Sequence, residues 1–132
     1  MIEVTLTRVG ACRVVHSASG ATILTDGPPA YGGGGTSFSA TDLLAAALGV
    51  CVATSIDRVV ERHGIPVSAL RLTVRKQLAM RPKRVAELAV TIRIAHRVPA
   101  GVRVRIERAA ATCAVKRSLH TDIPVRIALE LT

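Results

Sequence analysis

The most constraining feature of this 132-residue chain is a nearly unbroken apolar run from Leu43 to Ile56. Leu, Ala, Val and Cys fill almost every position, so a helix formed from this run is apolar on nearly all sides. The run is shorter than the ~20 apolar residues of a membrane span. It therefore predicts a central helix that is buried in the core of a soluble protein.

Signals for both ends of a helix flank this run. Before it, Ser39 or Thr41 can cap the helix N-terminus, and Asp42 is favourably placed in the first turn. After it, Gly64 followed by Pro66 is a typical helix stop. We expect the helix to begin within residues 37–42 and to end near residue 63.

Segments of alternating apolar and polar residues lie on both sides of the helix and predict β-strands. The glycine-rich residues 26–35 predict an irregular loop, and 49% apolar residues give one chain of this size enough core. The expected order is β-β-α-β-β-α-β, an α+β fold in a single domain over residues 1–132. The expected elements are strands at 2–16 and 21–25, the central helix, strands at 67–80 and 85–98, helices at 102–111 and 115–119, and a strand at 124–131.

The chain is strongly basic, with 18 Lys and Arg against 9 Asp and Glu and a formal net charge of +9. Such an excess can attract nucleic acid or other anions. Many of the arginines, however, alternate with apolar residues, as in Arg71 to Arg75 and Arg103 to Arg105, which is typical of solvent-facing sides of strands and helices. Tyr31 and Phe38 are its two aromatic residues, so base stacking is disfavoured. We expect a solvated basic surface, and nucleic-acid binding is the less favoured alternative.

Several other kinds of site are not indicated. The cysteines form no Cys-x-x-Cys pair and the four histidines have no metal-ligand spacing, so neither a metal nor a cofactor is expected. Gly32 to Gly35 lacks the following Lys-Ser/Thr of a phosphate-binding loop. The start Met1 to Val4 has no basic region followed by an apolar stretch, which predicts a cytoplasmic protein.

Each of the three cysteines has a structural explanation when it is taken alone. Cys51, inside the apolar helix, can pack as a small buried hydrophobic residue, and Cys113, after a predicted helix, can be a core thiol. Cys12 precedes His16 by four positions, which is a weak metal signal. Because Cys51 is far from the helix start, a reactive Cys51 requires a nearby cation, such as an Arg, to lower its pKa.

Taken together, several motifs resemble the family of osmotically inducible protein C and organic hydroperoxide resistance proteins (OsmC/Ohr), in its OsmC-like branch. They span nearly the whole chain. The most specific parts are the helix motif that ends at Cys51 and the second cysteine, Cys113, 62 positions later. The motifs are Asp26-x-Pro28, Gly32-Gly33, Ser39-Ala40-Thr41-Asp42-Leu43-Leu44-Ala45-Ala46-Ala47-Leu48-Gly49-x-Cys51, Gly64-Ile65-x-Val67, Cys113-x-Val115 and Ile123-Pro124-Val125.

The resemblance implies an OsmC-like fold, with antiparallel sheets packed around the buried helix in an intertwined homodimer. It implies that the Cys51 thiolate attacks an organic hydroperoxide and becomes a sulfenic acid, and that Cys113 resolves this acid as a Cys51–Cys113 disulfide. A dithiol or lipoyl-type reductant then restores the thiols. On this view the protein is an antioxidant peroxidase of the oxidative stress response that needs no cofactor.

The helix start and the second cysteine depart from the family pattern. Ala40 stands where Pro usually precedes the helix, and Ala114 stands where Pro often follows the second cysteine. Thr41 replaces the Glu of the hydroperoxide resistance branch, so that Asp42 is the nearby acid, as in the OsmC-like branch. Thr41 and Asp42 are therefore candidate supporting residues.

The activating arginine of the family is the remaining departure. It comes from the first hairpin or a nearby loop, where Arg8 and Arg13 are the candidates and the matching position falls on Gly10. Without an arginine at Cys51, the alternative is an OsmC-like dimeric scaffold without efficient peroxidase activity, which binds a hydrophobic small molecule or an anionic partner.

Overall fold

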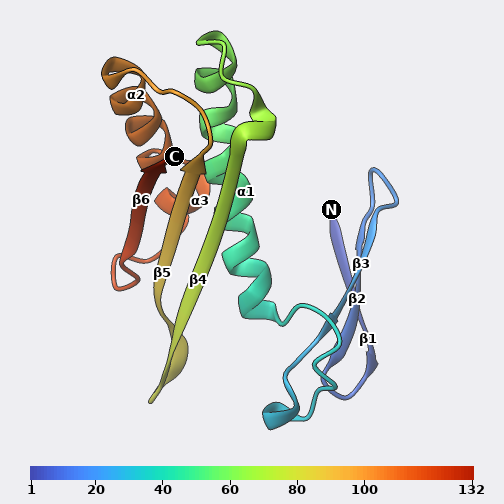
Figure 1. Ribbon diagram of the computed structural model, residues 1–132. Helices are drawn as coiled ribbons and strands as arrows, with labels where there is room; N and C mark the ends of the chain where they lie inside the picture. Colours follow the sequence, from blue (N-terminus) through green and yellow to red (C-terminus); the bar gives the residue numbers. More distant parts are fainter. The chain divides into compact units, whose positions relative to one another are not determined.

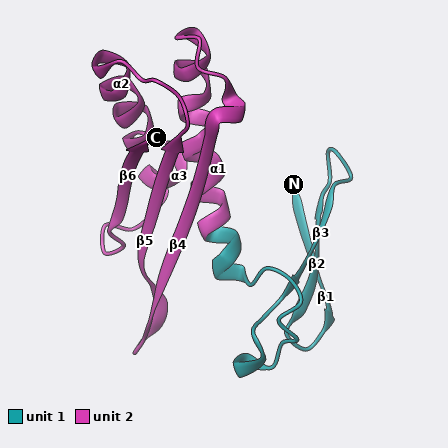
Figure 2. Ribbon diagram, in the orientation of Figure 1, with its two compact units in different colours: residues 1–44 teal, residues 45–132 magenta.

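A computed structural model describes all residues from 1 to 132. The chain divides into two compact units, residues 1–44 and residues 45–132 (Figure 2). The elements in chain order are β1 (Ile2–Arg8), β2 (Ala11–His16), β3 (Thr22–Asp26), a 3-10 turn (Pro29–Tyr31), α1 (Ala40–Arg62), a second 3-10 turn (Val67–Ala69), β4 (Leu70–Met80), β5 (Lys83–Ile94), α2 (Ala100–Ala111), α3 (Ala114–Ser118) and β6 (Val125–Leu131) (Figure 1).

The first unit contains an antiparallel sheet of three strands in the order β1-β2-β3. Its first two strands correct the sequence-based expectation of one strand over residues 2–16. The chain reverses at Gly10, whose φ of 80° lies in the left-handed region that favours glycine. The Gly10 carbonyl then accepts a hydrogen bond of 2.9 Å from the N–H of Gly27, which ties this turn to the start of the glycine-rich loop.

One face of this first sheet is apolar and exposed. Alternation along β1 places Ile2, Val4 and Leu6 on the same face, and the register brings Val14 opposite Val4 and Ile23 opposite Val14. Val4 is 63% exposed and Leu6 is 69% exposed. Contiguous apolar surface of this kind is typical of a protein interface.

The second unit contains a three-stranded sheet in the order β4-β5-β6. β4 and β5 form the expected hairpin, with a turn at residues 81–82 that is tighter than expected. β6 runs parallel to β5, which corrects the expectation of purely antiparallel sheets. The parallel pairing requires a crossover, which α2 and α3 supply between β5 and β6.

α1 contributes one side to the core of the second unit. Its fully buried side chains recur at helical spacing, and a Cβ at Gly49 would lie only 2.9 Å from Val74 Cγ2, so the helix backbone approaches β4 closely. Val50 remains 63% exposed in the single chain, so the chain's own sheet covers only one side of the helix. The buried residues of α1 are Ala45, Leu48, Val52, Ile56 and Val60.

The length of α1 also corrects an expectation. With 23 residues, α1 is long and apolar enough to cross a membrane by length and composition alone, whereas the sequence pattern predicted a helix too short to do so. One stripe of α1, which includes Leu48, Val52 and Ile56, is buried against the sheet of the second unit.

The opposite face of the second sheet carries exposed arginines. Arg93 pairs with Glu130 at 2.6 Å, and Arg126 pairs with Glu87 at 3.1 Å, while Arg71 lies opposite Arg93 in the sheet. All three guanidinium groups are exposed, as the alternating sequence predicted.

Replacing Arg71, Arg93 or Arg126 singly with Gln is expected to change the free energy of unfolding by no more than about 0.5 kcal/mol. Exposed ion pairs contribute little because water screens them and ordering two long side chains costs entropy. Urea denaturation of each variant measures the change. A loss of several kcal/mol at one position would contradict a solvated role for that arginine.

Candidate thiol site

The sulfur of Cys51 lies next to the start of α3. Cys51 follows Leu48 by nearly one turn of α1, at the edge of the buried stripe, and its side chain is half-buried. Its Sγ accepts a hydrogen bond of 3.4 Å from the backbone N–H of Val115. This contact joins two segments that are 64 residues apart in the sequence.

Cys113 occupies the junction between α2 and α3. Its side chain is only 2% exposed, and the residue is the N-cap of α3. Its Sγ accepts a hydrogen bond of 3.4 Å from the N–H of Lys116, in the way that a serine or aspartate oxygen usually caps a helix. Two consecutive backbone N–H groups of α3 thus donate hydrogen bonds to the two sulfurs, that of Val115 to Cys51 and that of Lys116 to Cys113.

The two thiols are in unequal environments. The pKa of Cys51 lies below the ordinary thiol value, first because of the Val115 N–H and further because of hydrogen bonds from Cys113, the Ala114 N–H and Ser55. Burial raises the pKa of Cys113, and the neighbouring Cys51 raises it further. When one proton is removed from the pair, it therefore comes from Cys51, while Cys113 keeps its proton and donates toward the Cys51 sulfur.

The origin of the lowered Cys51 pKa differs from the sequence-based expectation. The sequence predicted a cation, whereas the leading contribution is the backbone N–H of Val115. A backbone amide leaves no trace in residue identity, so no motif could have revealed it. Ser55 was also missed. It lies one turn after Cys51, and its hydroxyl donates a 2.7 Å hydrogen bond to the Cys51 carbonyl.

Thr41 and Asp42 form part of the first turn of α1. The N–H of Ser39 donates to Asp42 Oδ2 at 2.8 Å, and the N–H of Asp42 donates to Ser39 Oγ at 3.2 Å. This reciprocal pair is a capping box, which confirms Ser39 as the helix cap. Thr41 Oγ1 lies 3.2 Å from Ser39 Oγ. Neither residue is among the groups that lower the pKa of Cys51.

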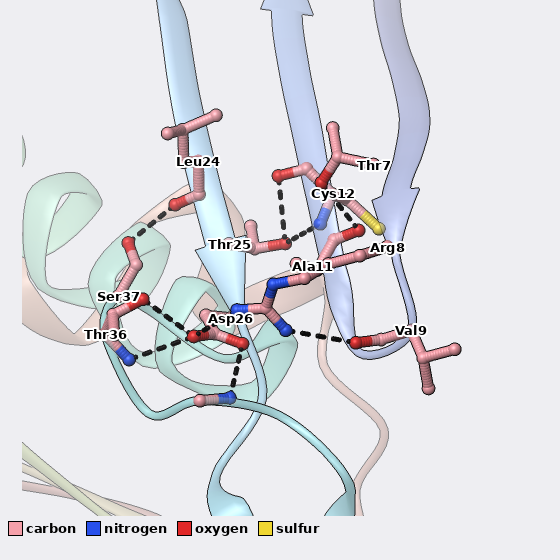
Figure 3. A network of polar contacts seen from close by, with 11 residues as sticks. Thr7, Arg8, Val9, Ala11, Cys12, Leu24, Thr25, Asp26, Thr36 and Ser37 are labelled. Carbon is pink, nitrogen blue, oxygen red and sulfur yellow. Dashed lines mark hydrogen bonds and ion pairs between the residues drawn. The ribbon is translucent and has the colours of Figure 1, made fainter.

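Arg8 is bound to a buried aspartate, Asp26, which the sequence indicated only as part of a motif (Figure 3). Asp26 is 3% exposed, and Arg8 pairs with it at 2.9 Å. The carboxylate also accepts hydrogen bonds from the Gly34 N–H at 2.8 Å, the Thr36 N–H at 3.1 Å and the Thr36 hydroxyl at 2.7 Å. Asp26 thus holds the glycine-rich loop together, and Arg8 balances the charge of its carboxylate. Arg13 is an exposed residue of β2.

This network makes a pH-dependent prediction. The hydrogen bonds from Gly34 and Thr36 hold the pKa of Asp26 far below its usual range. A carboxylate whose pKa is lowered by folding stabilises the protein above its unfolded pKa of about 3.9, and this contribution is lost as the pH falls through the folded pKa. We expect Asp26→Asn to lower the unfolding temperature at pH 7 by ~5–10 °C.

Thermal unfolding measured between pH 7 and pH 2 tests this prediction. The difference between wild type and Asp26→Asn is expected to stay constant down to about pH 4 and to shrink below it. The matched control is Asp122→Asn, because the Asp122 side chain is 80% exposed. Equal effects of the two variants at pH 7 would contradict a structural role for Asp26.

Cys12 lies in the first unit, on β2. Its thiol is free and half-buried, and its N–H donates to Thr25 Oγ1 at 3.2 Å. It lines an open cavity of about 280 Å³ together with threonines and Arg8. His16, at the end of the same strand, contacts Ser19 through Nδ1 at 2.7 Å.

Comparisons with known proteins agree with this architecture. A protein from Psychrobacter arcticus, assigned to osmotic stress induction and the detoxification response, is 29% identical, with a TM-score of 0.92 over 98% of this chain and 94% of that chain. An organic hydroperoxide resistance protein OsmC from Legionella pneumophila is 16% identical, with a TM-score of 0.78 over 98% and 95% of the two chains. OhrB of Bacillus subtilis is 14% identical, with a TM-score of 0.66 over 98% of each chain.

Among curated proteins, no sequence matches this chain significantly. The family description "OsmC-like protein" matches residues 32–128, a segment that begins in the glycine-rich loop, contains Cys51 and Cys113, and ends in β6. Most of the chain is thus covered by one family. The chain belongs to the OsmC-like family.

Proposed function

We propose that this protein is a thiol-dependent peroxidase that reduces organic hydroperoxides to alcohols. The observation that carries the proposal is the pairing of two unequal thiols at one helix start, with the Val115 N–H on the Cys51 sulfur and a buried Cys113 beside it. A lowered pKa increases the fraction of Cys51 that is thiolate, which is the nucleophilic form. Hydroperoxide resistance is named for the Legionella and Bacillus relatives, which supports this substrate class.

The proposed reaction has two steps. The Cys51 thiolate attacks the distal oxygen of the hydroperoxide, the O–O bond breaks, and the alkoxide leaves as an alcohol after taking up a proton, so that Cys51 becomes a sulfenic acid. Cys113 then attacks the Cys51 sulfur, an S–S bond forms, and the sulfenic oxygen leaves as water with the proton of the Cys113 thiol. Two electrons pass from the two thiols to the peroxide.

We propose further that the protein acts as a cytoplasmic homodimer, in which each chain is one domain over residues 1–132. The exposed apolar face of the first sheet and the exposed Val50 of α1 support the dimer, because both are surfaces that association would remove from water. A dithiol reductant completes the cycle.

The test is treatment of the fully reduced protein with one equivalent of an organic hydroperoxide. The expected product has lost two hydrogens and yields, on digestion without reductant, a disulfide-linked peptide pair that contains Cys51 and Cys113. Cys12 is expected to remain alkylatable throughout. If the hydroperoxide leaves both thiols free, the peroxidase proposal is wrong and the OsmC-like scaffold without efficient peroxidase activity takes its place.

A further inference from the structure

The net positive charge of this protein lies in residues 45–132, the part of the chain that contains Cys51 and Cys113. Sixteen of the 18 Lys and Arg residues lie in residues 45–132, together with only six of the nine acidic residues. Residues 97–119, which include α2 and α3, contain six basic residues and one acidic residue, Glu107. Cys113 lies within this segment.

Most of these cations are not neutralised within the chain. On the sheet, Arg93 and Arg126 each pair with a glutamate, and on α2 the one acid, Glu107, is taken by Arg103 at 3.0 Å. The remaining cations of α2 and α3, which are three exposed arginines and the half-buried Lys116, have no ion-pair partner within the chain. We define the cationic surface as Arg105, Arg108, Lys116 and Arg117.

The backbone that carries Lys116 and Arg117 is hydrogen-bonded to Cys113, and the charge of Lys116 acts on that thiol. The backbone N–H of Lys116 donates to the Cys113 sulfur at 3.4 Å, and the backbone N–H of Arg117 donates to the Cys113 carbonyl at 3.1 Å. The Lys116 ammonium donates to the Ala111 carbonyl at 3.3 Å, and its charge reaches Cys113, whose pKa it lowers against the stronger effect of burial. Arg108 lies in the last turn of α2, five residues before Cys113.

The reductive half of the proposed cycle has a use for such charge. A hydroperoxide is neutral, whereas the species that attacks a disulfide is a thiolate. In the transition state of exchange, one negative charge is shared among the attacking, central and leaving sulfurs. Nearby cations therefore attract the attacking thiolate and stabilise the charge as it spreads.

On the basis of the proposed function, we propose that the cationic surface recruits an anionic thiol, one that carries a carboxylate, as the reductant of the Cys51–Cys113 disulfide. The first thiolate attacks the disulfide, which forms a mixed disulfide and releases one cysteine thiolate. A second thiol, the other one of the same dithiol or that of a second molecule, breaks the mixed disulfide and releases the other cysteine. Two thiols are oxidised to one disulfide, and both protein thiols are restored with the two protons.

The experiment starts from protein oxidised with diamide, so that it does not depend on any reaction with peroxide. Reduction is followed in stopped flow with three thiol probes: 3-mercaptopropionate, which is anionic, 2-mercaptoethanol, which is neutral, and cysteamine, which is cationic. The test variant is Arg108→Glu with Arg117→Glu. The matched control is Arg71→Glu with Arg75→Glu, which changes the net charge equally. Those two side chains alternate with Val74, which faces α1, and so lie on the opposite face of the sheet.

Each rate is compared with the wild-type rate for the same probe, so that differences in intrinsic thiol reactivity cancel. In the test variant, reduction by 3-mercaptopropionate is expected to slow by about tenfold, reduction by 2-mercaptoethanol by less than about threefold, and reduction by cysteamine is expected to become faster. The control variant is expected to change all three rates by less than about twofold. Raising the salt from ~10 mM to ~500 mM is expected to remove most of the difference between test variant and wild type.

Three outcomes would overturn the inference: equal changes for the three probes in the test variant, equal effects of test and control variants, or no disulfide after diamide. If the glutamate variant fails to fold by circular dichroism, Arg108→Gln with Arg117→Gln gives the same comparison with a smaller expected effect. A protein that forms the disulfide with diamide and not with hydroperoxide, yet shows the expected charge dependence, contradicts the proposed function and supports this inference.

Discussion

Cys51→Ser is expected to reduce the reaction with an organic hydroperoxide to the background rate. A serine hydroxyl stays protonated near neutral pH, so the nucleophile that the Val115 N–H stabilises is missing in this variant. Consumption of peroxide by the reduced protein, measured in a single turnover, gives the rate. In the wild type, this rate is expected to level off at a pH below the ordinary thiol pKa of ~8.5, because the pKa of Cys51 is lowered.

Cys113→Ser has a different expected result, because Cys113 acts only after the oxygen has been transferred. This variant is expected to consume one equivalent of hydroperoxide and to stop as a Cys51 sulfenic acid, which a dimedone adduct detects by mass. Cys12→Ser is the matched control and is expected to turn over as the wild type does. Peroxide consumption that survives in Cys51→Ser would show that another group carries the chemistry.

The second large effect concerns assembly. We expect sedimentation to give a species of about twice the 13.9 kDa chain mass. The reason is the exposed apolar face of β1, on which Val4 is 63% and Leu6 is 69% exposed in a single chain. Leu6→Glu with Val4→Glu places charges on that face and is expected to shift the protein toward the monomer at micromolar concentration.

The control for assembly is Thr5→Glu, since Thr5 lies between these residues on the opposite face of β1. It is expected to sediment as the wild type does. A concentration-independent species near the mass of one chain would remove the dimer proposal.

The sequence predicted the elements of the fold well where local signals are strong. The start of α1 follows from Ser39 and Asp42, which form the capping box, and the hairpin of β4 and β5 follows from long alternating segments. The turn at Gly10 was missed because only two residues, Val9 and Gly10, separate β1 from β2. Such a short break in the alternation of apolar and polar residues resembles an irregularity within one strand. The parallel pairing of β6 was missed because alternation identifies a strand and not its neighbour.

The candidate site was predicted only in its side chains. Cys51 and Cys113 were singled out as a pair, and the structure brings them together. The groups that make them unequal are a backbone amide and different degrees of burial, which depend on how α3 meets α1. The candidates Arg8 and Asp42 are occupied by local structure, at Asp26 and at the helix cap.

The contact between α1 and the α2–α3 junction also bears on how this protein unfolds. A bond between Cys51 and Cys113 would close a loop of 62 residues that contains β4, β5 and α2. Closing a loop of this length lowers the entropy of the unfolded chain by an amount worth ~4 kcal/mol at 25 °C. The oxidised protein would therefore unfold at a higher temperature than the reduced protein, so that its unfolding temperature would depend on the redox state of its surroundings.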